Sequence, residues 1–230
     1  MREIVLDTET TGLDPDRGHR VVEIGCVELF NYVPTGDVRH YYLNPERDVP
    51  ADVVRVHGLT GEFLADKPLF SSIAADFVAF LGDAPLVIHN AAFDLKFVNA
   101  ELKRLGIPMI PFERTIDTVK LARQRDPRLR ANLDAVCKRF GIDTSHRDKH
   151  GALLDAELTA QVYLALRGGR QLGLMEDDSA AGAETISQFA ASARPFRAPR
   201  VFTVSEAEKA AHDALVETMP GALWRSRKAS

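Results

Sequence analysis

The segment REIVLDTE, residues 2–9, is a short apolar run that ends in acidic residues. Its aliphatic and β-branched centre predicts a buried strand. Two further strands are expected at VVEIGCVEL (21–29) and RHYYLN (39–44), which are rich in β-branched or aromatic residues. The connections between the three are short, and the second contains PTGD (34–37), a cluster of turn-forming residues. The expected start of the fold is therefore an antiparallel meander.

Helical periodicity follows these strands. Apolar residues recur at helical spacing over residues 71–82, 91–106, 132–141 and 151–166. A short apolar run, PLVIHN (85–90), reads as a buried strand between the first two of these helices. Three strands followed by alternating helices and strand predict an α/β fold with a mixed sheet flanked by helices.

The composition of the chain bounds its class. Of 230 residues, 45% are hydrophobic and 27% are charged, as in ordinary globular proteins. No apolar run approaches the ~20 residues of a membrane helix, and acids interrupt the first residues, where a signal peptide needs an apolar region. Cys26 and Cys137 lie far apart, which argues against a disulfide framework or structural zinc site and favours the reducing cytoplasm.

The formal net charge is −4, so the whole molecule does not attract nucleic acid or anionic lipid. If the protein handles DNA, it does so through local basic groups or bound metal cations.

Asp7 and Glu9 are the first candidates for chemistry. Residues i and i+2 of a strand point to the same face, about 6.6 Å apart. Two carboxylates so placed repel each other unless a cation lies between them, and Mg²⁺ prefers such oxygen ligands. A solvated strand edge is the alternative explanation.

Three later residues add to this pair. Asp94 stands in the first turn of the helix after PLVIHN, where a favourable interaction with the helix dipole is the alternative. His150 and Asp155 would lie some 140° apart on a continuous helix. They converge only if His150 lies in the preceding loop, and the adjacent Gly151 favours such a break. Asp155 lies among apolar residues and needs a partner or a metal, whereas His150 alone would read as a surface histidine.

Together these residues resemble a known family. DTETTG (7–12), HNAAFDLKFV (89–98) and HGALLDAELTAQVYL (150–164) resemble, in order and spacing, the three motifs of the DEDDh 3′→5′ exonucleases. The resemblance covers about residues 3–167. Within the family, the chain is most similar to the epsilon-type proofreading subunits of bacterial DNA polymerase III. The resemblance implies a ribonuclease-H-like mixed β-sheet flanked by helices, followed by a flexible C-terminal tail.

The resemblance also implies a catalytic set. Asp7, Glu9, Asp94 and Asp155 match the acids of the family, and His150 matches its general base. The implied reaction is hydrolysis at the 3′ end of DNA, which removes mismatched nucleotides during replication. Two divalent ions, Mg²⁺ or Mn²⁺, would be held by the four acids and would clamp the attacking and leaving oxygens.

Residues that bind the 3′-terminal nucleotide are implied by the same match. Thr10, Thr11 and Gly12 follow the first acids in a turn where backbone can approach a nucleotide closely. His57 in VHGLT borders that nucleotide in the family. Asp52 and Phe93 are further candidates, Phe93 as a surface for a base or sugar, and for these two a purely structural role remains equally open.

The composition and the hydrophobic pattern of the chain change after residue 168. We expect an exonuclease domain at 1–167, a linker with a clamp-binding motif at 168–204 and a polymerase-binding tail at 205–230. Within the tail, the SEAE sequence starting at Ser205 has the form of a helix capping box.

Two short sequences of the C-terminal part resemble partner-binding motifs. One resembles the motif with which replication proteins bind the sliding clamp, and the other the segment that holds the catalytic (alpha) subunit of DNA polymerase III. The residues concerned are Gln171, Leu172, Leu174 and Met175 for the clamp, and Leu223 and Trp224 for the polymerase. Incidental leucines in a linker, and a tail that docks on its own domain, are the alternatives.

Two other functions stay open from sequence. A free-standing DEDDh exonuclease acting on RNA or single-stranded DNA ends would keep every catalytic residue but has no need of the tail. A non-catalytic tether between clamp and polymerase would need the tail but not the catalytic residues.

Overall fold

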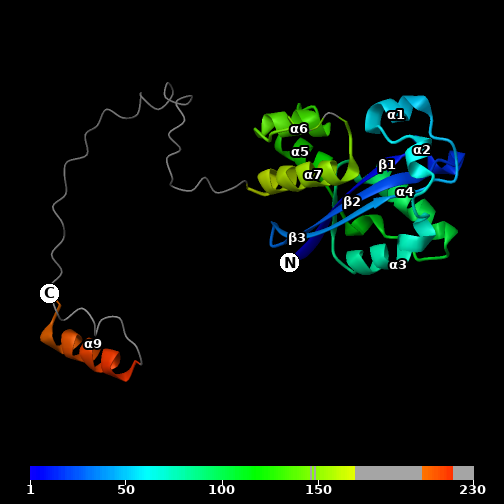
Figure 1. Cartoon of the computed structure of the whole chain (residues 1–230). Helices are drawn as coiled ribbons and strands as arrows, with labels where there is room; N and C mark the ends of the chain where they lie inside the picture. Colours follow the sequence, from blue (N-terminus) through cyan, green and yellow to red (C-terminus); the bar gives the residue numbers. More distant parts are fainter. Residues whose placement is uncertain (146, 148, 169–203, 220–230) are drawn as a thin grey trace. The chain divides into compact units, whose positions relative to one another are not determined.

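The computed structural model describes residues 1–145, 147, 149–168 and 204–219. The chain divides into two compact units, residues 1–175 and 176–230. Figure 1 shows the sheet and the helices of the first unit.

The first unit is built on a five-stranded mixed sheet of order β3-β2-β1-β4-β5. β1, β2 and β3 pair antiparallel, whereas β4 and β5 run parallel to β1. This arrangement confirms the expected meander and the ribonuclease-H-like mixed sheet. The strands are β1 (Arg2–Thr10), β2 (Val21–Phe30), β3 (Val33–Tyr42), β4 (Leu86–Ile88) and β5 (Thr115–Asp117).

All four helices expected from periodicity are present, and further helices join them. The expected four are α3 (Phe70–Leu81), α4 (Ala91–Arg104), α6 (Leu133–Arg139) and α7 (Ala152–Arg167). The others are α1 (Ala51–His57), α2 (Gly61–Leu64), α5 (Thr118–Arg125) and the short 3₁₀ turns η1 (Pro15–Arg17) and η2 (Phe112–Arg114).

The hairpin between β2 and β3 differs from the sequence prediction. The turn lies at Asn31 and Tyr32, which both have positive φ, and the predicted turn residues 34–37 belong to β3. Two consecutive residues with positive φ give a primed turn, whose twist matches the flanking strands. β3 is an edge strand, so it tolerates Pro34.

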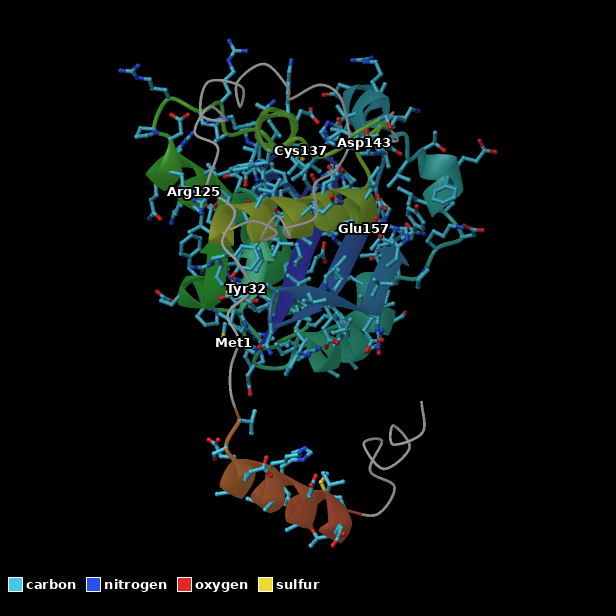
Figure 2. The ribbon with its side chains drawn as sticks, turned by 90° about the vertical axis from the view of Figure 1, so that its left-hand side faces the viewer. Met1, Tyr32, Arg125, Cys137, Asp143 and Glu157 are labelled. Carbon is cyan, nitrogen blue, oxygen red and sulfur yellow. The ribbon has the colours of Figure 1, made fainter. Side chains whose placement is uncertain are left out.

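Side chains alternate along β1 between two apolar layers. Ile4 and Leu6 pack in a core cluster with residues of α3 and α4, whereas Val5 packs on the opposite face with residues of α7. A third cluster joins α7 to α5 and α6. Helices therefore cover both faces of the sheet, with α7 lying across β1 and β2 (Figures 1 and 2).

The second unit contains α9 (Glu206–Thr218). Ser205 and Glu208 form a reciprocal capping box at its start, as the sequence predicts. None of its residues is buried. In the described parts of the chain, no helix has both the length and the apolar character to span a membrane.

Candidate active site

Asp7 and Glu9 lie near the C-terminal end of β1, on the face of the sheet that α7 covers. Val5 precedes them at the same two-residue spacing and packs against α7. The expected convergence of the two carboxylates on one face therefore holds. Thr8, between them, points to the opposite face, where it meets α4.

Asp94 reaches this end of the sheet from the first turn of α4. Its Oδ1 accepts hydrogen bonds from the Thr8 N–H at 2.9 Å and from the Thr8 hydroxyl at 2.7 Å. Asn90, which caps α4, has φ 69° and ψ 55°, a left-handed conformation that non-glycine residues rarely adopt. The connection from β4 into α4 is thus a tight turn that places Asp94 beside β1.

Asp155 lies in the first turn of α7 and reaches the same end of the sheet. Gly25 lies opposite Asp7 in the sheet, and a Cβ at this glycine would lie 2.3 Å from the carbonyl carbon of Ala152. Only glycine lets the start of α7 approach β2 so closely. This approach brings the buried Asp155 carboxylate to the acids of β1.

His150 lies in the loop before α7, as the break at Gly151 predicts. Its Nδ1 is 3.2 Å from Asp155 Oδ2, and its backbone N–H donates to the carbonyl of Val56 in α1 at 3.3 Å. Glu9, His150 and Asp155 each offer a ligand atom within 4.8 Å of the others. The side chain of His150 is 46% exposed, so it faces the opening of the site.

Arg147 joins this group and was not anticipated from the sequence. Its Nε and Nη2 donate to Oδ1 and Oδ2 of Asp155, each at 2.6 Å, and Nη2 also donates to His150 Nδ1 at 2.6 Å. A further hydrogen bond joins it to Asp134. In the sequence, Arg147 lies in the charged run SHRDKH, which reads as surface loop, yet its side chain is only 6% exposed.

Burial makes the negative charges of the other acids costly. It raises the pKa of Asp7 well above its ordinary value, and the charges of Asp94, Asp155 and Glu9 raise it further. Burial, followed by the charge of Asp155, raises the pKa of Glu9 to about 8. Burial raises the pKa of Asp94 to about 7, although the hydrogen bonds from Thr8 oppose the shift.

A divalent cation fits this donor set. Four carboxylates converge, and Arg147 pairs directly with only one of them, Asp155. Carboxylate oxygens are the ligands that hard divalent cations prefer. A bound cation would offset both the burial and the charge repulsion that raise the pKa of Asp7. The structure thus brings together the oxygen ligands of a candidate divalent-cation site at the end of the sheet.

A cavity of about 610 Å³ opens over the acids. Its lining includes Phe93, the ring of which lies 5.1 Å from that of Phe97. His89 also lines it, but both its ring nitrogens are engaged, with the Thr118 hydroxyl and the Ala131 carbonyl at 2.8 Å each. The hydrogen-bonding capacity of the His89 ring is therefore satisfied within the protein.

Hydrogen bonds within the protein fix the conformation of the turn after β1. The Thr10 hydroxyl donates to the Gly12 carbonyl at 2.6 Å, and the Thr11 N–H donates to the Arg20 carbonyl at 2.9 Å. A Cβ at Gly12 would lie 2.3 Å from the His19 ring. A larger residue at position 12 would therefore displace the ring of His19.

Two candidate substrate residues lie on α1. His57 is 6% exposed; its Nδ1 accepts a hydrogen bond from the Leu59 N–H at 3.0 Å, and its buried Nε2 has no hydrogen-bond partner among the described residues. Burial lowers the pKa of His57. Asp52 lies exposed in the first turn of the same helix. Neither lines the cavity over the acids.

The predicted partner-binding residues lie outside the described residues. They are Gln171, Leu172, Leu174, Met175, Leu223 and Trp224.

The fold and the site together define a metal-dependent nuclease on a ribonuclease-H-like sheet. The sequence profile of the Exonuclease family (RNase_T) matches residues 4–163. The chain belongs to this family.

Within this family, the chain is similar to proteins named DNA polymerase III subunit epsilon. The chain is 57% identical over 174 residues to DNA polymerase III subunit epsilon of Rickettsia prowazekii (strain Madrid E), over 74% of this chain and 76% of the relative. It is 42% identical over 240 residues to the protein of the same name from Salmonella typhimurium (strain LT2), over 98% of each chain.

Solved structures share the fold. Exonuclease X, in complex with 5′ overhanging duplex DNA, is 26% identical with a TM-score of 0.56, over 71% of this chain and 89% of that one. The nuclease domain of 3′hExo, a DEDDh family member bound to rAMP, has a TM-score of 0.61. It is 21% identical over 72% of this chain and 90% of that one.

Proposed function

We propose that this protein is the proofreading exonuclease of a bacterial DNA polymerase III, and that it removes mismatched nucleotides from the 3′ end of DNA. The observation that carries the proposal is the convergence of four carboxylates and a histidine beside one cavity. The relatives named DNA polymerase III subunit epsilon support its place in replication, in particular the relative that aligns over 98% of each chain.

We assign two divalent ions, Mg²⁺ or Mn²⁺, to the carboxylates. Asp7 would serve both ions, Glu9 and Asp155 would complete the ligands of one, and Asp94 would act near the other. Ions bound there would stabilise negative charge on the attacking and leaving oxygens of the phosphodiester. The buried acids would remain ionised in their presence, whereas burial alone favours their protonated forms.

His150 would accept the proton of the attacking water. A guanidinium can only donate hydrogen bonds, so the short contact from Arg147 requires a lone pair on His150 Nδ1. In the neutral ring the proton then lies on Nε2. The ring becomes a base when Arg147 leaves Nδ1, and the accessible position of His150 at the mouth of the site suits that role.

We place the 3′-terminal nucleotide between the turn after β1 and α1. Thr10, Thr11 and Gly12 would border it on one side and His57 on the other, with Phe93 as an apolar surface. The place of His57 supports this seat, because its imidazole is buried and interacts with the backbone of Thr10 in the turn after β1. Asp52, exposed at the start of α1, would lie at the rim.

We further propose three functional regions, with the nuclease domain at 1–167, the clamp motif and linker at 168–204 and the polymerase-binding tail at 205–230. The sliding clamp and the catalytic (alpha) subunit would be the partners. The exposed helix α9 supports a docking role for the tail, since it buries none of its side chains. Two free, buried cysteines support a cytoplasmic location.

The proposed function is tested with a 5′-labelled DNA oligonucleotide and Mg²⁺. Stepwise shortening from the 3′ end, faster for a mismatched than for a matched primer terminus on a template, is the expected result. A matched oligonucleotide with RNA at its 3′ end separates the DNA enzyme from an RNA exonuclease. Preference for the RNA end, or no shortening of DNA, would contradict the proposal.

A further inference from the structure

The cavity over the acids extends well beyond them, toward α5 and α6. On that side its wall consists of Val119 and Arg123 from α5, followed by Ala131, Asn132 and Leu133 at the start of α6. None of these residues belongs to a family motif named above. A volume of about 610 Å³ exceeds what ions alone need, so this part of the cavity is open to substrate.

Two polar side chains of this wall are available for a ligand. Arg123 is exposed, and within the described part of the chain no hydrogen bond or ion pair engages its guanidinium. Asn132 occupies the N-cap position of α6, yet its side chain makes no capping hydrogen bond. A donor-rich guanidinium beside an unengaged amide is suited to the oxygens of a phosphate group.

The surrounding segment is also strongly basic. Residues 118–133 contain five cations and one acid, whereas the whole chain has a net charge of −4. The cations are Lys120, Arg123, Arg125, Arg128 and Arg130. This segment is therefore a local source of positive charge where the cavity opens, and a polyanion entering the site would be attracted to it.

On the other side of the acids, next to α1, we have placed the 3′-terminal nucleotide. The backbone of His150 is hydrogen bonded to Val56, so the base lies against the end of α1 that carries His57. Because the 3′-terminal nucleotide is placed beside α1, the chain leading away from the cleaved bond has the α5–α6 side available. No residue of α1 lines the cavity on that side.

We infer that Arg123 and Asn132 form a subsite for the phosphate next upstream of the one that is cleaved. The inference rests on the proposed function and adds a requirement, namely that efficient substrates carry at least two phosphodiesters. In the alternative explanation, Arg123 only stabilises α5 through a favourable interaction with the helix dipole at its C-terminal end. That role makes no distinction between substrates with one and with two phosphates.

Two substrates separate these explanations. The 4-nitrophenyl ester of thymidine 5′-monophosphate has only the phosphate to be cleaved, whereas the trinucleotide dTpdTpdT has one more upstream. We expect Arg123→Gln to lower kcat/KM about tenfold or more for the trinucleotide and to leave the ester within twofold of wild type. Arg123→Lys should recover part of the loss. Lys103→Gln, at the far end of α4, is the matched charge control.

A neutral methylphosphonate at the upstream position completes the test. Wild type should lose about the factor that Arg123→Gln loses, and Arg123→Gln should be insensitive to the replacement. Asn132→Ala should show the same trend more weakly. Melting temperatures of all variants check that they are folded.

The outcomes that overturn the inference are distinct. An equal loss on ester and trinucleotide, or no loss on either, would show that Arg123 does not bind the upstream phosphate. Hydrolysis of neither substrate by the wild-type protein would instead remove the proposed function, and the inference with it.

Discussion

Both oxygens of the Asp155 carboxylate accept a hydrogen bond from Arg147, at 2.6 Å each. The two side chains are 5% and 6% exposed, so this is a buried ion pair in the position where a metal ion would need Asp155. Each oxygen keeps a further lone pair, but a cation bound there would lie beside the guanidinium and be repelled by its positive charge. Arg147 and a metal therefore compete for Asp155.

We predict opposite effects of Arg147→Gln on the metal-free and the metal-bound protein. Without metal, the variant leaves Asp155 buried and unpaired, which should cost about 3–5 kcal/mol of stability. With Mn²⁺, binding no longer requires displacement of the guanidinium, so the metal-induced rise in melting temperature should exceed that of wild type. Differential scanning calorimetry with and without Mn²⁺ measures both effects.

The control for this comparison is Arg139→Gln, an exposed arginine of α6 with no ion pair among the described residues. It should change neither the metal-free stability nor the response to Mn²⁺. If Arg147→Gln bound Mn²⁺ more weakly than wild type, competition would be the wrong description of the pair.

Asp7 should be the acid whose loss costs most activity. Asp7→Asn keeps the shape of the side chain but removes the carboxylate that we assign to both ions, so hydrolysis should fall below about 1% of wild type. Burial already raises the pKa of Asp7, because its charge is unfavourable in the metal-free protein. The melting temperature without metal should therefore stay equal or rise.

Glu113→Gln, an exposed acid of η2, is the matched control and should retain full activity. Retention of more than one per cent of activity by Asp7→Asn would refute the assignment of Asp7 to the ions.

Residue spacing could predict where each of the candidate catalytic side chains lies locally, whereas their assembly into one site was implied only by the resemblance to the DEDDh exonucleases. The two-residue period of a strand is enough to put Asp7 and Glu9 on one face. The break at Gly151 separates the loop that holds His150 from the helix that holds Asp155. Asp94 follows from the start of a helix directly after a strand. In each case the local backbone geometry, which sequence patterns report well, decides where the carboxylate or the imidazole lies.

Other features depend on tertiary contacts that leave no local pattern. Arg147 is surrounded in sequence by charged residues and becomes buried only because α7 brings Asp155 to it. The helix α1 has mostly exposed residues and no clear apolar period. The hairpin turn at Asn31 and Tyr32 was missed because PTGD is the stronger turn sequence. Here the register of β2 and β3 determines the turn.

The pH dependence of stability should reveal the acids in the absence of metal. Burial raises the pKa of Glu9 to about 8 and that of Asp94 to about 7 in the folded chain, against ordinary values of 4.5 and 3.8. Between pH 6.5 and 8.5 the folded state therefore holds more protons than the unfolded state. Stability falls as pH rises through this window.

Two histidines contribute mainly outside that window. Burial lowers the pKa of His57 and His89, so their contribution changes below pH 6.5. We expect the melting temperature of the metal-free protein to decrease from pH 6.5 to 8.5, and Glu9→Gln to flatten the decrease. Saturating Mg²⁺ should abolish it. A melting temperature that rose with pH without metal would contradict the raised pKa values.

The tail should be separable from the nuclease. Truncation after Arg167 removes residues beyond α7 and keeps the buried residues of the sheet and its helices. The truncated protein should degrade short single strands at close to the full-length rate but should not retain the polymerase catalytic subunit in a pull-down. Trp224→Ala alone should weaken that association by about 2 kcal/mol or more.

Clamp binding provides an independent control for the tail. Gln171→Ala with Leu174→Ala should weaken clamp binding and leave the polymerase bound, because the two motifs are separate in sequence. Equal recovery of polymerase by full-length and truncated protein would exclude the tail as its binding segment.

His150 should be required for proton transfer and not for binding the metal. Its Nδ1 accepts a hydrogen bond from Arg147, whereas removal of the imidazole leaves the carboxylates that we assign to the ions unchanged. His150→Ala should therefore lose about 10²–10⁴-fold in rate and still show a metal-induced rise in melting temperature close to that of wild type. Single-turnover hydrolysis and calorimetry with Mn²⁺ measure the two properties on the same preparation. His212→Ala, in the exposed helix α9, is the matched histidine control and should hydrolyse short strands normally. If His150→Ala lost the response to Mn²⁺ together with activity, His150 would be a ligand of the ion, and the base would have to be sought elsewhere among the groups of the cavity.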